Sequence, residues 1–144
     1  MTEYPHPAAL IPHRPPMLYI DRVVSVEGFR VVCERAFAPH EFPGHFPGRP
    51  IVPGVVMLEG LAQALACLGA LGGELGQAVL TGVEKARFRG LVEPPATLVF
   101  DVEVTDRRFG VVWASGVVRQ GDREVCTAKL QAAILPADGG VPPA

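Results

Sequence analysis

Two ionisable side chains stand in unusual settings in this sequence. His45 lies within residues 42–54, a segment so dense in proline and glycine that it cannot form a helix and holds the imidazole on a stiff loop. Glu59 interrupts residues 55–71, an almost continuous apolar run that lacks proline. Burying a carboxylate in such a run is costly unless the group is paired or used. We therefore start from these two residues.

His45 and Glu59 have complementary chemistry. His45 precedes the predicted helix closely, and the positive end of the helix dipole favours the neutral imidazole that a general base requires. The alternative for His45 is a loop histidine whose ring is satisfied by backbone carbonyls. Apolar surroundings favour a protonated Glu59, which can donate a proton. The alternative for Glu59 is a buried ion pair with a basic residue.

Pro53 and Gly54 stand at the predicted start of the helix. The first backbone N–H groups of a helix, here those of Gly54 and Val55, have no partner within the helix and suit a developing oxyanion. Gln63 lies one turn beyond Glu59 on the same face. A base, an acid and oxyanion donors are what is needed to remove a proton next to a thioester carbonyl and expel a β-hydroxyl.

A metal site is not expected. His40, Glu41 and His45 superficially resemble a zinc-binding H-E-x-x-H motif, but their spacing differs from it. Pro43 and Gly44 also exclude the helix that would bring the two histidines to one face.

The remaining candidate residues have weaker signals. His6 is expected in solvent, and for His13, in a Pro-His-Arg-Pro connector, a structural and a functional role both stay open. Cys67 lacks an adjacent base and is interpreted as small apolar filling. The sequence contains no G-x-S-x-G, phosphate loop or dinucleotide fingerprint, which argues against serine hydrolases, NTPases and nucleotide-cofactor enzymes.

One long helix and six strands are predicted to position these residues. The helix covers residues 55–71 and is apolar on nearly every side, which indicates that it is buried all round. The strands are expected at residues 17–26, 29–37, 79–89, 98–105, 111–119 and 124–135, joined by short turns that favour antiparallel neighbours. Alternation in the second strand places Phe29 on one face with Val31, Cys33 and Phe37.

This order of elements predicts an α+β fold in which a curved antiparallel sheet covers one side of the helix. A second copy of the protein is expected to cover the rest. We expect one domain over residues 1–144, with loose termini at about 1–9 and 136–144.

Composition excludes several functional classes. A net charge of −2 argues against a nucleic-acid binder. Three cysteines without paired spacing argue against a disulfide framework and favour a reducing, cytoplasmic setting. No signal peptide is visible, and the predicted helix, which is short and carries Glu59 and Gln63, is a poor membrane span.

Three stretches are distinctive in combination. They are residues 45–55 (HFPGRPIVPGV) followed by Leu58-Glu59 and Gln63, residues 12–23 (PHRPPMLYIDRV), and residues 82–89 (GVEKARFR). Together they closely resemble the FabZ-type β-hydroxyacyl-acyl-carrier-protein dehydratases, and the likeness covers about residues 10–135. It implies the hotdog fold, a long helix wrapped by an antiparallel sheet, with dimers as the unit and trimers of dimers common.

The resemblance implies roles for the matched residues. His45 takes the proton next to the thioester, Glu59 of the other subunit protonates the departing hydroxyl, and the Gly54 N–H binds the carbonyl. Gln63 orients Glu59 or a water. Glutamate rather than aspartate at the acid position points to the dehydratase rather than the FabA isomerase side. Glu84 and residues 93–97 depart from the usual pattern, with effects expected at a local turn and the tunnel mouth.

The implied substrate is a 3-hydroxyacyl chain carried on the phosphopantetheine of acyl carrier protein, with the chain in an apolar tunnel and no bound cofactor or metal. The product is a trans-2-enoyl thioester for fatty-acid or related polyene or polyketide synthesis. A hotdog thioesterase and a non-catalytic acyl-carrier-binding subunit are the alternatives. Basic side chains are expected to attract the acidic carrier protein: Arg49, Lys85, Arg87, Arg89, Arg107 and Arg108.

Overall fold

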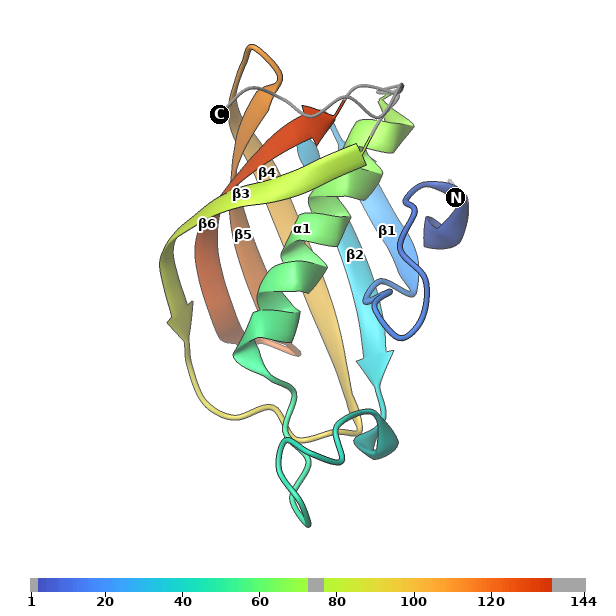
Figure 1. Ribbon diagram of the computed structural model, residues 1–144, viewed down its shortest axis with the longest axis vertical. Coiled ribbons are helices and arrows are strands. Elements are labelled where there is room, and N and C mark those ends of the chain that lie inside the picture. The colour runs from blue at the N-terminus through green and yellow to red at the C-terminus, as the bar shows by residue number, and fades with distance from the viewer. Residues whose placement is uncertain (1–2, 73–76, 136–144) are drawn as a thin grey trace.

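The computed structural model describes residues 3–72 and 77–135 (Figure 1). Within these residues, one α-helix lies against a six-stranded antiparallel sheet whose order is β1-β2-β4-β5-β6-β3. The predicted α+β architecture is confirmed. The elements are η1 (Pro7–Ala9), β1 (Arg22–Glu27), β2 (Arg30–Phe37), η2 (Pro39–Glu41), α1 (Gly54–Leu71), β3 (Gln77–Phe88), β4 (Ala96–Arg108), β5 (Val111–Gln120) and β6 (Arg123–Leu135), where η denotes a 3₁₀ turn.

The first strand begins later than predicted. Residues 17–21 were expected to be extended in the sheet, but β1 begins at Arg22. The reason is that the backbone of Met17 and Tyr19 bonds to the helix, and bonding to β2 begins only at Asp21, whose N–H donates to the Glu34 carbonyl at 2.9 Å. The Tyr19 N–H donates to Gln63 Oε1 at 2.8 Å, and Gln63 Nε2 donates to the Met17 carbonyl at 2.8 Å.

The described part of the N-terminal arm is more ordered than predicted. Residues 7–9 form η1, and His6 caps it by accepting a 3.0 Å hydrogen bond from the Ala8 N–H at Nδ1. Tyr4 also holds the arm to the sheet, because its hydroxyl accepts from the Val26 N–H at 3.1 Å. The prediction of a loose tail at 136–144 lies outside the described residues.

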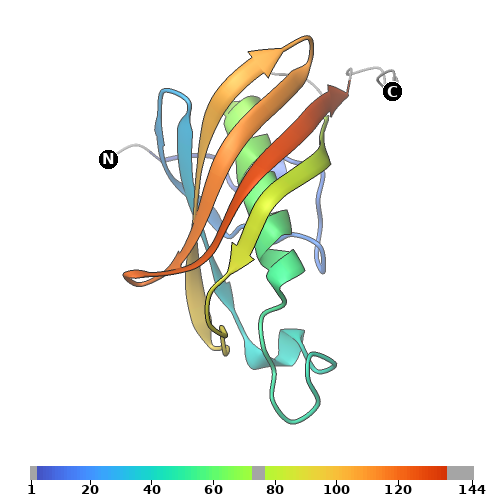
Figure 2. The ribbon, with the colours of Figure 1, turned by 90° about the vertical axis from the view of Figure 1, so that its left-hand side faces the viewer.

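Small residues let α1 approach the sheet closely (Figure 2). A Cβ atom at Gly60 would lie 2.3 Å from the Phe100 ring of β4, and one at Gly116 of β5 would lie 2.9 Å from Leu61. Side chains larger than hydrogen at these two positions would push the helix away from the sheet. The close packing of Gly60 on the sheet therefore fixes the distance between the sheet and the adjacent residue Glu59.

The core lies between this face of α1 and the sheet. Val31, Cys33 and Phe37 of β2 are buried there, as their alternation predicts, but Phe29 is 64% exposed. Phe29 lies in the turn before β2, but it lines the pocket between α1 and the sheet, so it is on the same side of the sheet as these three residues, as predicted.

The opposite side of α1 is not fully covered by this chain. Only 39% of the helix is buried, and Val55 in its first turn is 71% exposed. By length and composition the helix could also cross a membrane, with a mean hydropathy of 1.7, but it packs across the sheet as the core helix. The expectation that α1 is buried all round is therefore not met within the single chain.

Candidate active site

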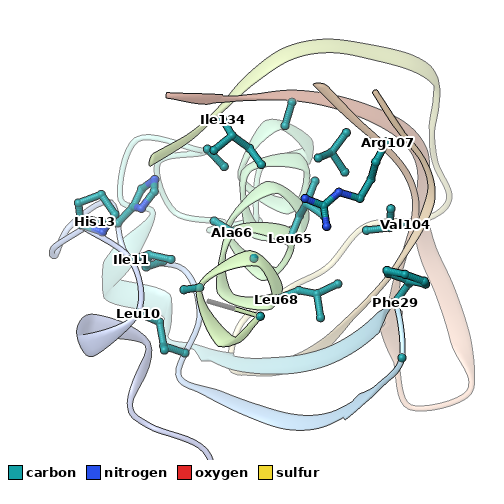
Figure 3. A pocket seen from close by; sticks show the side chains of 18 residues that line it. Leu10, Ile11, His13, Phe29, Leu65, Ala66, Leu68, Val104, Arg107 and Ile134 are labelled. Carbon is teal, nitrogen blue, oxygen red and sulfur yellow. The ribbon is translucent and has the colours of Figure 1, made fainter. Parts of the chain in front are cut away.

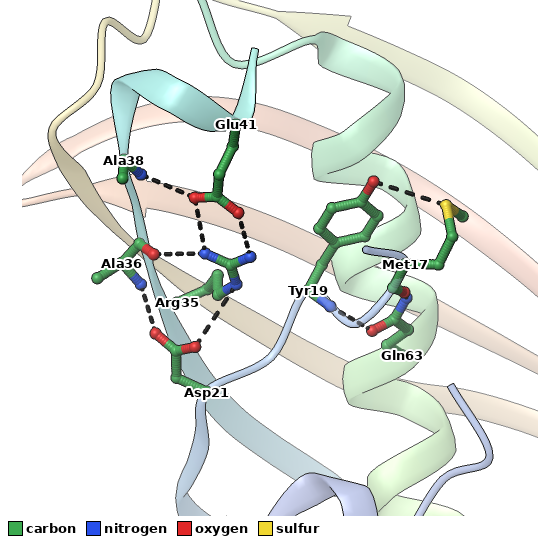
Figure 4. A network of polar contacts seen from close by, with 8 residues as sticks. All are labelled: Met17, Tyr19, Asp21, Arg35, Ala36, Ala38, Glu41 and Gln63. Carbon is green, nitrogen blue, oxygen red and sulfur yellow. Dashed lines mark hydrogen bonds and ion pairs between the residues drawn. The ribbon is translucent and has the colours of Figure 1, made fainter. Parts of the chain in front are cut away.

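Glu59 and Gln63 form a hydrogen-bonded pair in the middle of α1. Gln63 is 1% exposed, and its Nε2 donates to Glu59 Oε2 at 2.8 Å. The bonds from Gln63 to the backbone of Met17 and Tyr19 anchor the amide from the other side (Figure 4). The Glu59 side chain keeps 29% of its surface exposed.

Tyr19 is a second titratable group near the carboxyl. Burial and, after it, the negative charge of Glu59 raise the pKa of the Tyr19 phenol. The phenol hydroxyl donates to Met17 Sδ at 3.6 Å (Figure 4). Tyr19 therefore remains a neutral neighbour of Glu59 at physiological pH.

His45 is held by the loop formed by residues 42–53. Its Nδ1 lies 3.0 Å from the Ile51 carbonyl, and its ring stacks on Phe46 with centroids 4.2 Å apart. A carbonyl accepts only from an N–H, so Nδ1 carries the proton and Nε2 presents a lone pair. That tautomer can act as a base at Nε2, as proposed from the sequence.

The first turn of α1 offers unpaired backbone donors. The N–H groups of Val56 and Met57 bond to the Pro53 carbonyl at 3.0 and 3.3 Å. Those of Gly54 and Val55 meet no acceptor within the described residues. The Phe88 ring lies against Gly54, where an added Cβ would be 2.8 Å from it, so glycine suits this position.

His13 lies beside the Glu59 carboxyl. Its Nε2 is 3.6 Å from Glu59 Oε2, and its Nδ1 is buried and meets no hydrogen-bond partner among the described residues. The sequence left the role of His13 open, because nothing local to the Pro-His-Arg-Pro connector shows which part of α1 it meets.

An apolar pocket of about 260 Å³ lies between the C-terminal half of α1 and the sheet (Figure 3). The His13 ring forms part of its wall on one side, and Arg107 of β4 reaches it from the other. Most of the remaining lining is aliphatic, including Leu65, Leu68, Val104 and Ile134. Its lining suits a hydrocarbon chain.

Within the single chain, no hydrogen bond or ion pair joins His45 to Glu59 in the described residues. The loop carrying His45 and the middle of α1 are separate parts of the chain. A search of the described residues for a metal site finds no group of three His, Cys, Asp or Glu side chains that could hold an ion.

The predicted basic side chains divide into two groups. Lys85, Arg87 and Arg89 lie at the end of β3 that meets the start of α1, since neighbouring Phe88 packs on Gly54. Arg107 and Arg108 lie at the β4–β5 hairpin, at the other end of the sheet (Figure 1). Within one chain, the length of the sheet therefore separates Arg107 and Arg108 from the first group.

Arg89 of the first group, and Arg49, which belongs to neither group, each have an acidic partner. Arg89 lies 3.6 Å from Glu124, and Arg49 of the His45 loop donates to Glu93 at 2.5 Å. Both pairs are about half exposed, so each contributes little to stability.

The model of the FabA-like domain matches residues 11–129 of this chain. The chain belongs to the FabA-like family. It is 41% identical over 131 residues to the 3-hydroxyacyl-[acyl-carrier-protein] dehydratase FabZ of Alkaliphilus metalliredigens, which covers 88% of this chain and 89% of that protein. It is 42% identical over 132 residues to the FabZ of Chloroflexus aggregans, covering 88% and 91%.

Solved structures agree with this membership at the level of the fold. The dehydratase heterocomplex ApeI:P from Xenorhabdus doucetiae superposes with a TM-score of 0.84 over 95% of each chain, at 15% identity. The FabA-like fold is the hotdog fold, and the prediction of that fold from the sequence is confirmed.

Proposed function

We propose that this chain is a hydro-lyase that removes water from 3-hydroxyacyl thioesters carried on acyl carrier protein, giving trans-2-enoyl thioesters in fatty-acid or related synthesis. The observation that carries the proposal is a carboxyl held by a buried glutamine in the middle of the core helix, in a chain more than 40% identical to FabZ dehydratases.

His45 acts as the base in this proposal. Its Nε2 takes a proton from C2 of the substrate while Nδ1–H remains bonded to the Ile51 carbonyl. The negative charge that develops on the thioester oxygen is bound by the N–H groups of Gly54 and Val55, which point from the positive end of α1. These helix-end donors do the work that a metal ion does in other enzymes, so the proposal needs no bound cofactor.

Glu59 acts as the acid. Its protonated carboxyl gives a proton to the 3-hydroxyl, the C3–O bond breaks, and the electron pair from C2 forms the C2–C3 double bond. Gln63 supports this role because it bonds Oε2 and leaves Oε1 to face the substrate. In this proposal the acid comes from a second copy of the chain, as the resemblance to FabZ-type dehydratases implies.

Two surfaces support a homodimer. β3 is an edge strand of the sheet, and Val79, Val83 and Phe88 on it are more than a third exposed. Val55, in the first turn of α1 close to Phe88, lies on the uncovered side of the helix. An exposed apolar edge next to an exposed apolar helix face is suited to a copy of itself, which would complete both the sheet and the site.

Acyl carrier protein is the proposed carrier partner, and the cytoplasm is the proposed location. The basic group of Lys85, Arg87 and Arg89 lies next to the Gly54 end of α1, where an acidic carrier would deliver its phosphopantetheine arm. The apolar pocket near His13 is suited to take the acyl chain beyond the reacting carbons.

A single assay tests the function. The full chain is incubated with a 3-hydroxyacyl or trans-2-enoyl thioester, and enoyl absorbance is followed together with release of free thiol. Reversible gain or loss of enoyl absorbance that is abolished by His45→Ala supports the proposal.

The other outcomes overturn it. Thiol release without enoyl formation indicates a hotdog thioesterase. Binding of acyl carrier protein without any reaction indicates a non-catalytic carrier-binding subunit.

A further inference from the structure

His13 approaches the same carboxyl oxygen as Gln63. The imidazole Nε2 lies 3.6 Å from Glu59 Oε2, and the His13 and Glu59 side chains are about equally exposed, at 26% and 29%. This separation is slightly longer than a hydrogen bond. Catalytic hydrogen bonds are often long before the substrate is bound and shorten in the complex.

Gln63 makes the two carboxyl oxygens unequal. The Tyr19 N–H can only donate, so the side of the amide that faces it is the oxygen, Oε1. The Gln63 NH₂ group therefore faces both the Met17 carbonyl and Glu59 Oε2. Oε2 accordingly accepts hydrogen bonds, and the proton that Glu59 gives away sits on Oε1.

The surroundings of His13 select its tautomer. Nδ1 is buried and has no hydrogen-bond partner in the described structure. A proton on Nδ1 would create a buried N–H with no acceptor, whereas Nε2–H points toward an oxygen that accepts. The favoured form is the neutral ring with its proton on Nε2.

We propose that His13 is a positioning residue for the acid Glu59 of its own chain. Its Nε2–H joins Gln63 in holding Oε2, so that Oε1 faces the 3-hydroxyl, and the same N–H stabilises the carboxylate that remains after the proton has left. This inference rests on the proposed dehydratase function.

The His13 ring has a second contact that the test must separate. It forms part of the wall of the pocket next to Leu10 and Ile11 (Figure 3). Loss of the wall would weaken binding of long acyl chains, whereas loss of the Nε2 donor would lower kcat for chains of any length.

The experiment compares three variants of the full chain on 3-hydroxybutyryl and 3-hydroxydecanoyl thioesters. His13→Phe keeps a ring in the wall but lacks the donor. His13→Gln retains a donor in the place of Nε2, and His13→Asn retains one only in the place of Nδ1. His40→Asn, a change at an exposed histidine outside the site, is the control.

We expect His13→Phe and His13→Asn to lower kcat about 10-fold on both substrates, with KM changed less than about 2-fold. His13→Gln should restore most of the kcat. The basic limb of the pH profile should move up in His13→Phe, because the lost donor favoured the carboxylate. Tyr19, His13 itself and His45 across the proposed dimer contact are the other titratable groups near Glu59.

Equal kcat and pH profiles in wild type and His13→Phe would overturn the inference while leaving the dehydratase function intact. A loss that appears only with the longer substrate, or only in KM, would also overturn it and assign His13 to the pocket wall. Inactive wild-type protein would instead refute the proposed function. Thermal unfolding of each variant identifies misfolding. If His13→Phe misfolds, the kcat values of His13→Gln and His13→Asn are compared instead, and equal values would overturn the inference.

Discussion

Two carboxylates of this protein sit on opposite sides of the same core and are held in different ways. Glu59 on α1 receives one hydrogen bond from a neutral amide, has the His13 imidazole 3.6 Å away, and is 29% exposed. Asp101 on β4 points to the outer face of the sheet, and its side chain is 9% exposed.

Asp101 is fully paired. Arg30 of β2 donates to both of its oxygens at 2.8 and 2.7 Å, and Arg119 of β5 donates to Oδ2 at 2.9 Å. Hydrogen bonds from Arg30, and after them those from Arg119, hold the pKa of Asp101 below its ordinary value despite its burial. The three side chains tie three adjacent strands together.

The difference indicates which carboxylate can react. Two guanidinium groups keep Asp101 ionised and donate hydrogen bonds to both of its oxygens, so the role of Asp101 is to stabilise the sheet. Glu59 has no guanidinium partner among the described residues and a partly exposed side chain, so it can hold and release a proton. The predictions below test this contrast.

Glu59→Gln should have the largest effect. The amide keeps the shape of the carboxyl but cannot give a proton, so kcat/KM should fall about 1,000-fold with the free energy of unfolding nearly unchanged. Steady-state kinetics and chemical denaturation measure the two. Asp101→Asn is the matched control and should retain activity, and a large loss of activity there would contradict the contrast.

Gln63→Leu should lower both stability and activity. The Met17 carbonyl and the Tyr19 N–H would lose their partner in a partly buried place, which should destabilise the fold by about 1–2 kcal/mol. The kcat should fall about 10-fold because Oε2 of Glu59 is no longer held. Thr81→Val removes an exposed hydroxyl bond to the Gln131 carbonyl and should change stability by less than about 0.5 kcal/mol.

Asp101→Asn should lower stability at pH 7 by about 2 kcal/mol, a moderate value because Arg30 is half exposed. Since the folded state depresses the pKa of Asp101, its stabilisation is present above the unfolded pKa of about 3.9 and is lost as pH falls through the folded pKa. The gap between wild type and variant should therefore be constant from pH 5 to 7 and shrink below pH 4. An unchanging gap down to pH 2 would show that Asp101 contributes no charge-dependent stability.

The smallest effect concerns the cysteines, which line the core between these two clusters. All three are buried, burial raises the pKa of Cys126 to about 11, and a hydrogen bond with Cys67 together with burial raises that of Cys33. Few thiolates of Cys33 and Cys126 form at pH 8, and all three thiols are buried, so a thiol reagent should label the native protein slowly and the unfolded protein at once. Rapid labelling of native protein would show that this core opens.

Much of the framework could be predicted from the sequence because its signals are local. The apolar run without proline predicts α1, alternation predicts β4 and β6 in place, and the spacing of Glu59 and Gln63 places them on one helix face. The start of β1 was predicted wrongly because the backbone of residues 17–19 bonds to a side chain far along the chain.

By itself the sequence determined the helix, the stiff loop around His45, and the pairing of an acid with an amide one turn away, since each depends on neighbours in the chain. Only the tertiary structure decided the sheet order, the separation of the basic side chains into two groups, and the placement of His13 beside Glu59. These contacts join distant segments, and the packing of α1 on the sheet through Gly60 and Gly116 is what brings those segments together.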